Sequence, residues 1–322
     1  MRKKIVVIGG GTGNFVILRG LKKYDVDLSA IVAMADSGGS TGILRDELGV
    51  LPPGDVRQCL VALSNSSRVM RSLMNYRFEN GNLGGHNFGN LLLSALEKVT
   101  GSFERAVEEA GRILYIKGKV IPVTLNQVHL KMILKNSKML DGEGEIYLSQ
   151  EIYQGYKSIY LEPYPTVNPR VIDEIMNADL VVLGPGGFYT SLIPNLLVEG
   201  VTEALQKTLA KKVFVVNLMN RKGQFTTHKV SDRLIELVKF LGKDIFDYIL
   251  VNKSKPSQEL IQNYSEEGDL VENDINKDER VIAADLLGPL ASVAKNDLIK
   301  RSLIRHDSKK LAKEIIAIVN NI

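Results

Sequence analysis

The sequence has little of what several large classes of protein require. It contains one cysteine, Cys59, which excludes an internal disulfide and suits a reducing compartment. No stretch reaches the ~18 uninterrupted apolar residues that a membrane span needs. Only four apolar residues follow the basic residues of MRKKIVVIGGG, which is too few for a signal peptide. We therefore expect a cytoplasmic protein without a membrane span.

Patterns of charge and of catalytic residues are also sparse. The chain has 41 basic and 37 acidic residues and no basic run longer than three, which favours a mixed surface over nucleic-acid binding. Its four histidines lack the spacing of zinc ligands. There is no Ser-His-Asp order or Cys-X-X-Cys pair, and Cys59 lies in an apolar helical stretch, where a packing role is expected.

The pattern that is present is that of an α/β protein. Residues 4–8 form an apolar run ending in glycines, a helical pattern follows, and LSAIVAMAD (residues 28–36) is a second apolar run. This β-α-β opening predicts a Rossmann-like, doubly wound, mainly parallel sheet with helices on both faces.

The middle of the chain has a different period. Apolar and polar residues alternate around residues 128–134, and Asp141-Gly142 is a turn dipeptide, so we expect an antiparallel excursion at about 119–163. A C-terminal helix is expected at about 307–321. No repeat or linker divides the chain, which favours a single domain over residues 1–322.

The first glycine loop, GGGTGN, follows the first strand. Its candidate ligand contacts are Gly10, Gly11, Thr12, Gly13 and Asn14. The glycines would let the backbone approach a phosphate, and the next helix would offer its N-terminal amides. Because Asn14 replaces the third glycine and no Gly-Lys-Ser/Thr follows, neither the dinucleotide fingerprint nor the P-loop is complete. A tight strand-to-helix turn is the alternative.

A second glycine-rich segment runs from the end of the second strand to a helix expected at about residues 55–64, and we interpret it as a long loop. Asp36, 27 residues after Gly9, could bind a ribose, a metal or a substrate hydroxyl, or cap a helix. Asp55 could hold Mg²⁺, act as a base or be an ordinary N-cap. Arg57 could clamp a phosphate or form a surface ion pair. The amides and hydroxyls of a nest-like phosphate site are Ser37, Gly38, Gly39 and Ser40.

Two further glycine loops are candidates for ligand binding. In GGHNFGN, Asn87 and Asn90 could contact a base or a sugar, whereas His86 is more simply a structural hydrogen-bonding group. The loop GPGGFYTS contributes Gly184, Pro185, Gly186, Tyr189 and Thr190. Its tyrosine could stack on a ring, and its threonine could hold a phosphate.

The motifs together resemble a known family. GGGTG, DSGGSTG, LPPGD, GGHNFGN, GPGGFYTSLIPNLLV, NLM and RHD occur in this order along nearly the whole chain, as in the bacterial gluconeogenesis factors. That family is related to the 2-phospho-L-lactate transferases. The resemblance implies a Rossmann-like fold with its ligand across the strand ends, binding of UDP-sugars such as UDP-N-acetylglucosamine, and a role in growth and cell shape on gluconeogenic carbon sources.

The resemblance also extends to particular residues. It implies phosphate or ribose contacts in GGGTG, a nucleotide side formed by Asn90 and the loop of residues 184–190, and Arg305 of RHD as a cation for a diphosphate. Asn217 aligns with the first residue of the family's NLM motif. Ser37 stands where the family usually has a second aspartate, which weighs against the metal-dependent chemistry of the transferases.

Three functions follow from these patterns. The first is a regulatory protein that binds a nucleotide-sugar and signals to protein partners, with a homodimer expected from the fold class. The alternative is a phospho-group transferase in which Asp36 and Asp55 hold Mg²⁺. An NAD(P) oxidoreductase is the third, and the incomplete fingerprint disfavours it.

Overall fold

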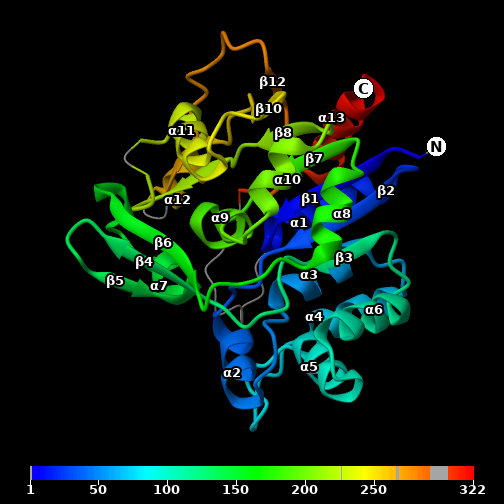
Figure 1. The fold of residues 1–322 in the computed structure, drawn as a ribbon. Helices are drawn as coiled ribbons and strands as arrows, with labels where there is room; N and C mark the ends of the chain where they lie inside the picture. The colour runs from blue at the N-terminus through cyan, green and yellow to red at the C-terminus, as the bar shows by residue number, and fades with distance from the viewer. Residues whose placement is uncertain (1, 226, 266–267, 291–303) are drawn as a thin grey trace.

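A seven-stranded parallel sheet forms the centre of the computed structural model, which describes residues 2–225, 227–265, 268–290 and 304–322 (Figure 1). The strand order is β12-β10-β8-β7-β1-β2-β3, and every neighbouring pair is parallel. The strands are β1 (Lys4–Gly9), β2 (Asp27–Val32), β3 (Lys119–Pro122), β7 (Leu180–Leu183), β8 (Lys211–Val215), β10 (Tyr248–Asn252) and β12 (Val281–Ala284). The predicted fold class is confirmed.

The strand order contains a topological switch point. From β1 the chain adds β2 and β3 on one side, whereas β7 is followed on the other side by β8, β10 and β12. The loops that follow β1 and β7 therefore leave the sheet in opposite directions. In open α/β sheets, ligands bind at the carboxyl ends of the strands beside such a point. The topology thus singles out the edge next to β1 and β7.

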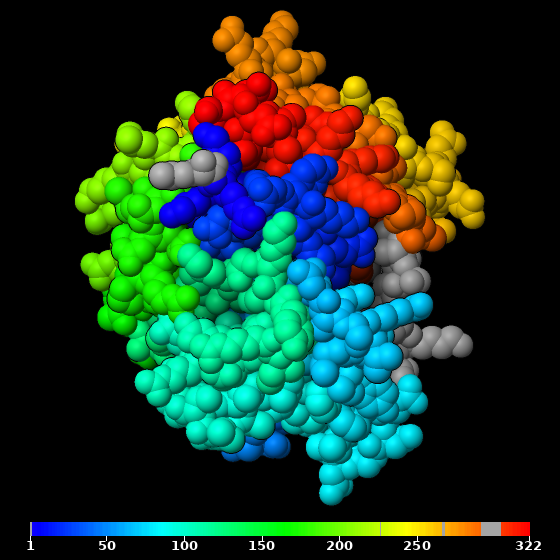
Figure 2. All heavy atoms as spheres, turned by 90° about the vertical axis from the view of Figure 1, so that its right-hand side faces the viewer, coloured from blue at the N-terminus to red at the C-terminus, as the bar shows by residue number. Residues whose placement is uncertain are grey.

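Helices cover both faces of the sheet. On one face α1 (Gly11–Leu21) contacts α3 (Gly54–Leu63) and α13 (Ser308–Asn320), and Figure 2 shows the red C-terminal helix against the blue N-terminal segment. A second contacting group comprises α8 (Pro169–Met176), α10 (Val201–Lys207) and α11 (Val230–Leu241). The other α-helices are α2 (Gly39–Leu48), α4 (Arg68–Asn75), α5 (Phe88–Thr100), α6 (Phe103–Ile113), α7 (Gly142–Leu148), α9 (Ile193–Leu196) and α12 (Gln258–Tyr264).

The apolar runs are strands because both faces of the sheet are covered. Ile5, Val7 and Ile8 of β1 have no exposed surface, as expected for a strand in the middle of a parallel sheet. The same continuous core includes Leu130 and Met132 of the antiparallel region. Because one core joins the two sheets, we propose a single domain.

The antiparallel region is smaller than the sequence suggested. It consists of β4 (His129–Leu134) between β5 (Met139–Asp141) and β6 (Tyr156–Glu162), and stands beside the main sheet in Figure 1. The expected start at 119 was wrong, because β3 pairs in parallel with β2. The turn expected at Asp141-Gly142 was also wrong. The hairpin turns at Ser137, whose φ is 69°, and Gly142 instead begins α7.

Other boundaries differ where polar or glycine-rich sequence hides a helix. The segment after Asp36 is not one long loop, because it contains the ten-residue helix α2, whose polar, glycine-containing first turn lacks an apolar period. The strand expected at residues 28–36 pairs only to Val32. The apolar residues from Leu196 suggest a helix that begins there, but α10 begins at Val201, after Gly200 at φ 88°. Before it lie a short π-helix, η2 (Phe188–Leu192), and α9. A short two-stranded sheet pairs β9 (Met219–Arg221) with β11 (Gly268–Leu270).

Candidate functional site

Several loops meet at the carboxyl ends of the strands. The loop after β1 touches the loop after β7 so closely that a β-carbon on Gly13 would lie 1.8 Å from the carbonyl oxygen of Pro185. Asn217, after β8, donates to the Gly186 carbonyl at 2.7 Å and accepts from the Gly186 amide at 3.0 Å. We call this region the strand-end site and define it as residues 10–14, 36–40 and 184–190 together with Asp55, Glu143 and Asn217.

Two helices begin in these loops without a side-chain cap. Gly10 is the N-cap of α1 and Gly38 is the N-cap of α2, and neither first turn contains an acidic residue. The first amides of a helix carry a partial positive charge, which an uncapped terminus can offer to a ligand. Two such termini in one region are suited to phosphate oxygens.

Three carboxylates border the same region. A β-carbon on Gly10 would lie 2.2 Å from Asp55 Oδ2, and one on Gly54 would lie 2.3 Å from Asp36 Oδ2. Asp36 Oδ1 also accepts from the Gly38 amide at 2.9 Å. Asp55 lies in the first turn of α3, where Pro53 occupies the N-cap position, so Asp55 is not an ordinary N-cap.

The third carboxylate, Glu143, lies outside the motifs that the sequence analysis identified. It lies in the first turn of α7 and forms side-chain hydrogen bonds with Asp36 and Thr190. Only packing brings it to the site, since a β-carbon on Gly142 would lie 2.9 Å from Ser37 Oγ. Burial raises the pKa of Glu143 well above its ordinary value, and the charges of Asp36 and then Asp55 raise it further.

The raised pKa of Glu143 predicts a pH-dependent stability. The pKa of a glutamate in the unfolded chain is about 4.3, and the folded state binds the Glu143 proton more tightly than that. The free energy of unfolding therefore falls as pH rises above 4.3 and through the folded pKa. We expect Glu143→Gln to raise the melting temperature at pH 8 by roughly a few degrees, with no gain at pH 4. Thermal unfolding in a chelating buffer measures this. Glu199→Gln, at an exposed position, is the control. If the melting temperatures of the two variants depended on pH in the same way, the link between Glu143 protonation and stability would be refuted.

The donor chemistry at this site suits magnesium only in part. Carboxylate oxygens are the ligands that Mg²⁺ prefers, and the ion commonly binds through one or two of them while keeping several waters. Asp36 and Asp55 fit that requirement. Among the described residues, no three or more His, Cys, Asp or Glu side chains are arranged to hold a metal ion. A magnesium site at Asp36 and Asp55 therefore stays a prediction.

A second group of predicted residues forms a network beneath the site. Arg57 Nε donates to Asn90 Oδ1 at 2.9 Å, and Asn90 Nδ2 donates to Ser40 Oγ at 3.4 Å. Asn87 caps α5 by accepting from the Asn90 amide at 3.2 Å, and His86 Nδ1 lies 3.3 Å from Ser40 Oγ. All five side chains are buried. In this structure these side chains bond one another, an arrangement that would hold the start of α2 in place. Their direct contact with a ligand stays a prediction.

Tyr189 and Asn14, two further predicted ligand contacts, are buried in this structure. The Tyr189 ring stacks on Phe225 with centroids 5.6 Å apart, and its hydroxyl donates to Glu236 Oε1 at 3.1 Å. Asn14 is fully buried, with its amide against the Gly9 backbone. The amide of Asn14 has no hydrogen-bond partner in the interior, whereas the ring and the hydroxyl of Tyr189 are both in contact with other side chains.

The predicted residues thus fall into two groups by exposure. Those with partly or fully exposed surface are Gly11, Thr12, Gly13, Asp36, Ser37, Gly38, Gly39, Asp55, Gly186, Asn217 and Arg305. Those that are buried are Gly10, Asn14, Ser40, Arg57, Asn87, Asn90, Gly184, Pro185, Tyr189 and Thr190. The exposed group provides surface that a ligand could contact in this structure, and the ligand contacts of both groups stay predictions.

The RHD motif runs along the same edge of the sheet. His306 hydrogen-bonds to the backbone of Val216, the residue before Asn217, and burial lowers the pKa of His306 to about 4. Asp307 caps α13 by accepting from the amides of Lys309 and Lys310, and the helix covers nearly the range expected from the sequence. Arg305 is partly exposed, and its backbone carbonyl accepts from the Gly288 amide at 2.8 Å.

Comparisons with known proteins agree with this fold. The model of the family described as 2-phospho-L-lactate transferase CofD matches residues 5–287. A Clostridium acetobutylicum protein, provisionally named as a gluconeogenesis factor, is 41% identical over 97% of this chain and 69% of its own length. The gluconeogenesis factor of Bacillus subtilis is 38% identical over 98% of both chains.

A solved structure is also similar. It is a member of the UPF0052 family from Bacillus halodurans, with a TM-score of 0.88, 35% identity, and coverage of 98% of this chain and 99% of that chain. Among the described residues, no helix has the length and apolar character that crossing a bilayer requires.

Proposed function

Because the chain belongs to the CofD family and, within it, to the gluconeogenesis factors, we propose that it binds a nucleotide-sugar of the UDP-N-acetylglucosamine class at the strand-end site. In this proposal the protein is a cytoplasmic regulator that supports growth and cell shape under gluconeogenic conditions. The observation that carries the proposal is the pair of uncapped helices, α1 and α2, at the switch point of the sheet.

The geometry suggests how such a ligand would lie. The diphosphate would sit against the N-terminal amides of α1 and α2, where backbone N–H groups and helix dipoles favour negative charge. Gly186, held by Asn217, would form the side of the site next to β7. Asp36 and Glu143 would accept hydrogen bonds from sugar or ribose hydroxyls. Arg305 would add a cation for the diphosphate.

Ligand-induced stabilisation tests the proposal. We expect UDP-N-acetylglucosamine to raise the melting temperature, because a ligand at 100 times its Kd adds ~2.7 kcal/mol to the stability of the native state. GDP and NAD, each with and without Mg²⁺, should produce smaller shifts. Arg305→Gln should weaken binding of the UDP-sugar, whereas Arg105→Gln, on the exposed side of α6, should not. Absence of a shift with every uridine nucleotide would exclude this function.

A transferase is the second candidate, favoured by the meeting of Asp36, Asp55 and Glu143. Asp36 and Asp55 would hold Mg²⁺, which would offset charge on a transferring phospho group. The amides of α1 and α2 would bind the rest of the donor. We expect Asp55→Asn to abolish release of nucleotide from a nucleotide-linked phospho donor while sparing donor binding. If the unaltered protein releases no nucleotide with Mg²⁺ and an alcohol acceptor, the binding function alone stands.

A further inference from the structure

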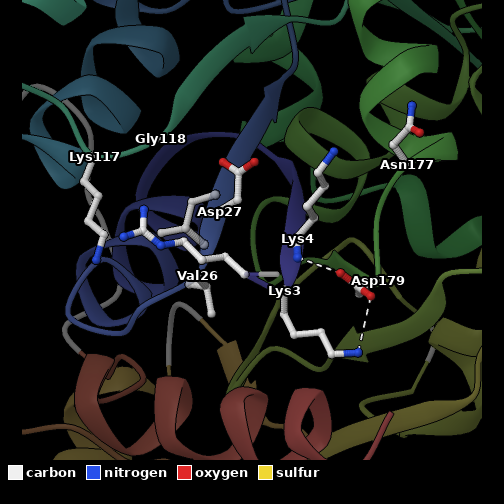
Figure 3. Close-up of a pocket in the computed structure, with 10 residues that line it drawn as sticks. Lys3, Lys4, Val26, Asp27, Lys117, Gly118, Asn177 and Asp179 are labelled. Carbon is white, nitrogen blue, oxygen red and sulfur yellow. Dashed lines mark hydrogen bonds and ion pairs between the residues drawn. The ribbon is translucent and has the colours of Figure 1, made fainter.

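A cavity of about 950 Å³ lies at the opposite edge of the sheet (Figure 3). It opens where β1 and β2 begin, beside the residues that precede β3 and β7. Its charged lining comprises four cations and two carboxylates: Arg2, Lys3, Lys4, Lys117, Asp27 and Asp179. The strand-end site uses the carboxyl ends of the same parallel strands, so this cavity is a separate feature of the fold.

The carboxylates neutralise only part of this positive charge. Asp179 accepts from Lys3 Nζ at 3.4 Å and from the Lys4 backbone amide at 2.7 Å. The Lys4 ammonium forms no hydrogen bond or contact ion pair among the described residues. Its charge does act on Glu174, whose pKa it helps to lower. Lys117 Nζ donates to the Tyr24 carbonyl at 2.6 Å, which is a neutral partner. Two ammonium groups therefore remain without an opposite charge in contact.

These two lysines come from segments far apart in the sequence. In the view of Figure 3, Lys117 stands on one side of the cavity and Lys4 on the other, with Asp27 between them. Gly118 allows this arrangement, because a β-carbon there would lie 2.5 Å from the Leu28 carbonyl oxygen. The fold thus holds cations around a hollow, whereas an ordinary basic surface spreads them over a convex face.

We propose that this cavity binds a small anion that carries two or more charges on phosphate groups. Arg2 is ion-paired with Asp25 at 2.7 Å, so the three lysines and two carboxylates of the lining leave a net charge of +1. The ammonium groups of Lys4 and Lys117 would meet the charges of a compact phosphate ester or diphosphate. Ammonium and guanidinium groups both pair well with phosphate oxygens. The volume is within the range of cavities that take small ligands. This second site goes beyond the function proposed above and does not depend on it.

Local NMR signals of the full chain test the proposal with inorganic pyrophosphate as the probe. We expect the backbone amides of Lys4, Asp27 and Gly118 to shift saturably, whatever binds at the strand-end site. Lys4→Gln with Lys117→Gln should weaken this local binding roughly tenfold, because each exposed charge contributes up to about fivefold. Asp27→Asn, which removes the carboxylate between the lysines, should strengthen it severalfold. Binding should also weaken as salt is added.

Matched controls separate a built site from general charge attraction. The pair Lys207→Gln and Lys255→Gln removes two lysines that do not line the cavity and should leave the titration unchanged. Loss of pyrophosphate binding in that pair, or unchanged binding in the Lys4 and Lys117 pair, would overturn the proposal. Absence of saturable shifts would also overturn it. Equal shifts with citrate would show a general anion site and refute the assignment to phosphates.

Discussion

Replacing Gly13 with alanine is expected to destabilise the protein by about 3 kcal/mol, which is the upper part of the usual range for overpacking. The added β-carbon would lie 1.8 Å from the Pro185 carbonyl oxygen and 2.5 Å from its carbonyl carbon. Both are backbone atoms, so neither can rotate away. The first turn of α1 and the loop after β7 would have to separate, which would also disrupt binding at the strand-end site.

A second glycine provides a matched control for this substitution. Gly144 lies in α7, and apart from its chain neighbours and the backbone of its own helix no described heavy atom lies within 4 Å of the position of its β-carbon. Gly144→Ala should therefore be neutral or stabilise by up to ~1 kcal/mol through helix propensity. Urea denaturation measures both variants. If Gly13→Ala were as stable as Gly144→Ala, the close contact between the loops after β1 and β7 would be refuted.

Replacing Arg57 with methionine should cost about 3 kcal/mol of folding free energy. The guanidinium donates to Asn90 Oδ1, to Asn75 Oδ1 at 2.7 Å and to the Met74 carbonyl at 3.3 Å. A buried acceptor that loses a charged donor keeps its desolvation cost but no longer has a hydrogen bond to offset it, which lowers the free energy of unfolding. Arg57→Lys should recover only part of the loss, because one ammonium cannot reproduce the planar arrangement of donors.

The same substitution distinguishes a supporting role from direct phosphate binding. If Arg57 supports α2 from below, Arg57→Met lowers stability strongly, and affinity falls only as the loop loosens. If Arg57 contacts phosphate, affinity falls while the midpoint of urea denaturation stays unchanged. Arg105→Met, on an exposed face of α6, should stay within 0.5 kcal/mol of the unaltered protein.

The sequence predicted the sheet well because buried parallel strands have a strong local pattern. The apolar runs at residues 4–8 and 28–36 supplied β1 and β2, although β2 pairs only to Val32. Helix α2 was missed because the residues at its start, GSTG, have the composition of a turn. Asp141-Gly142 was misread because the same dipeptide can turn a hairpin or begin a helix.

The candidate site was predicted as a set of loops more reliably than as a set of contacts. Glycine loops after parallel strands meet at one edge whatever their side chains do, which is why residues 10–13 and 184–186 come together. Whether a side chain faces the ligand depends on what packs beside it. Tyr189 forms a hydrogen bond with Glu236, and Arg57 forms one with Asn90, so both side chains point into the protein.

The amino-acid sequence by itself determined the strand-and-helix rhythm, the positions of the glycine loops and the likeness to one family. Each of these features depends on residues that are close together in the sequence, because the spacing of apolar residues and the positions of glycines are local properties. Tertiary structure alone decided that Glu143 joins Asp36 and Asp55, and that Lys4 and Lys117 face one cavity. Those partners are distant in the chain, and their meeting depends on packing between elements, which local sequence patterns do not encode.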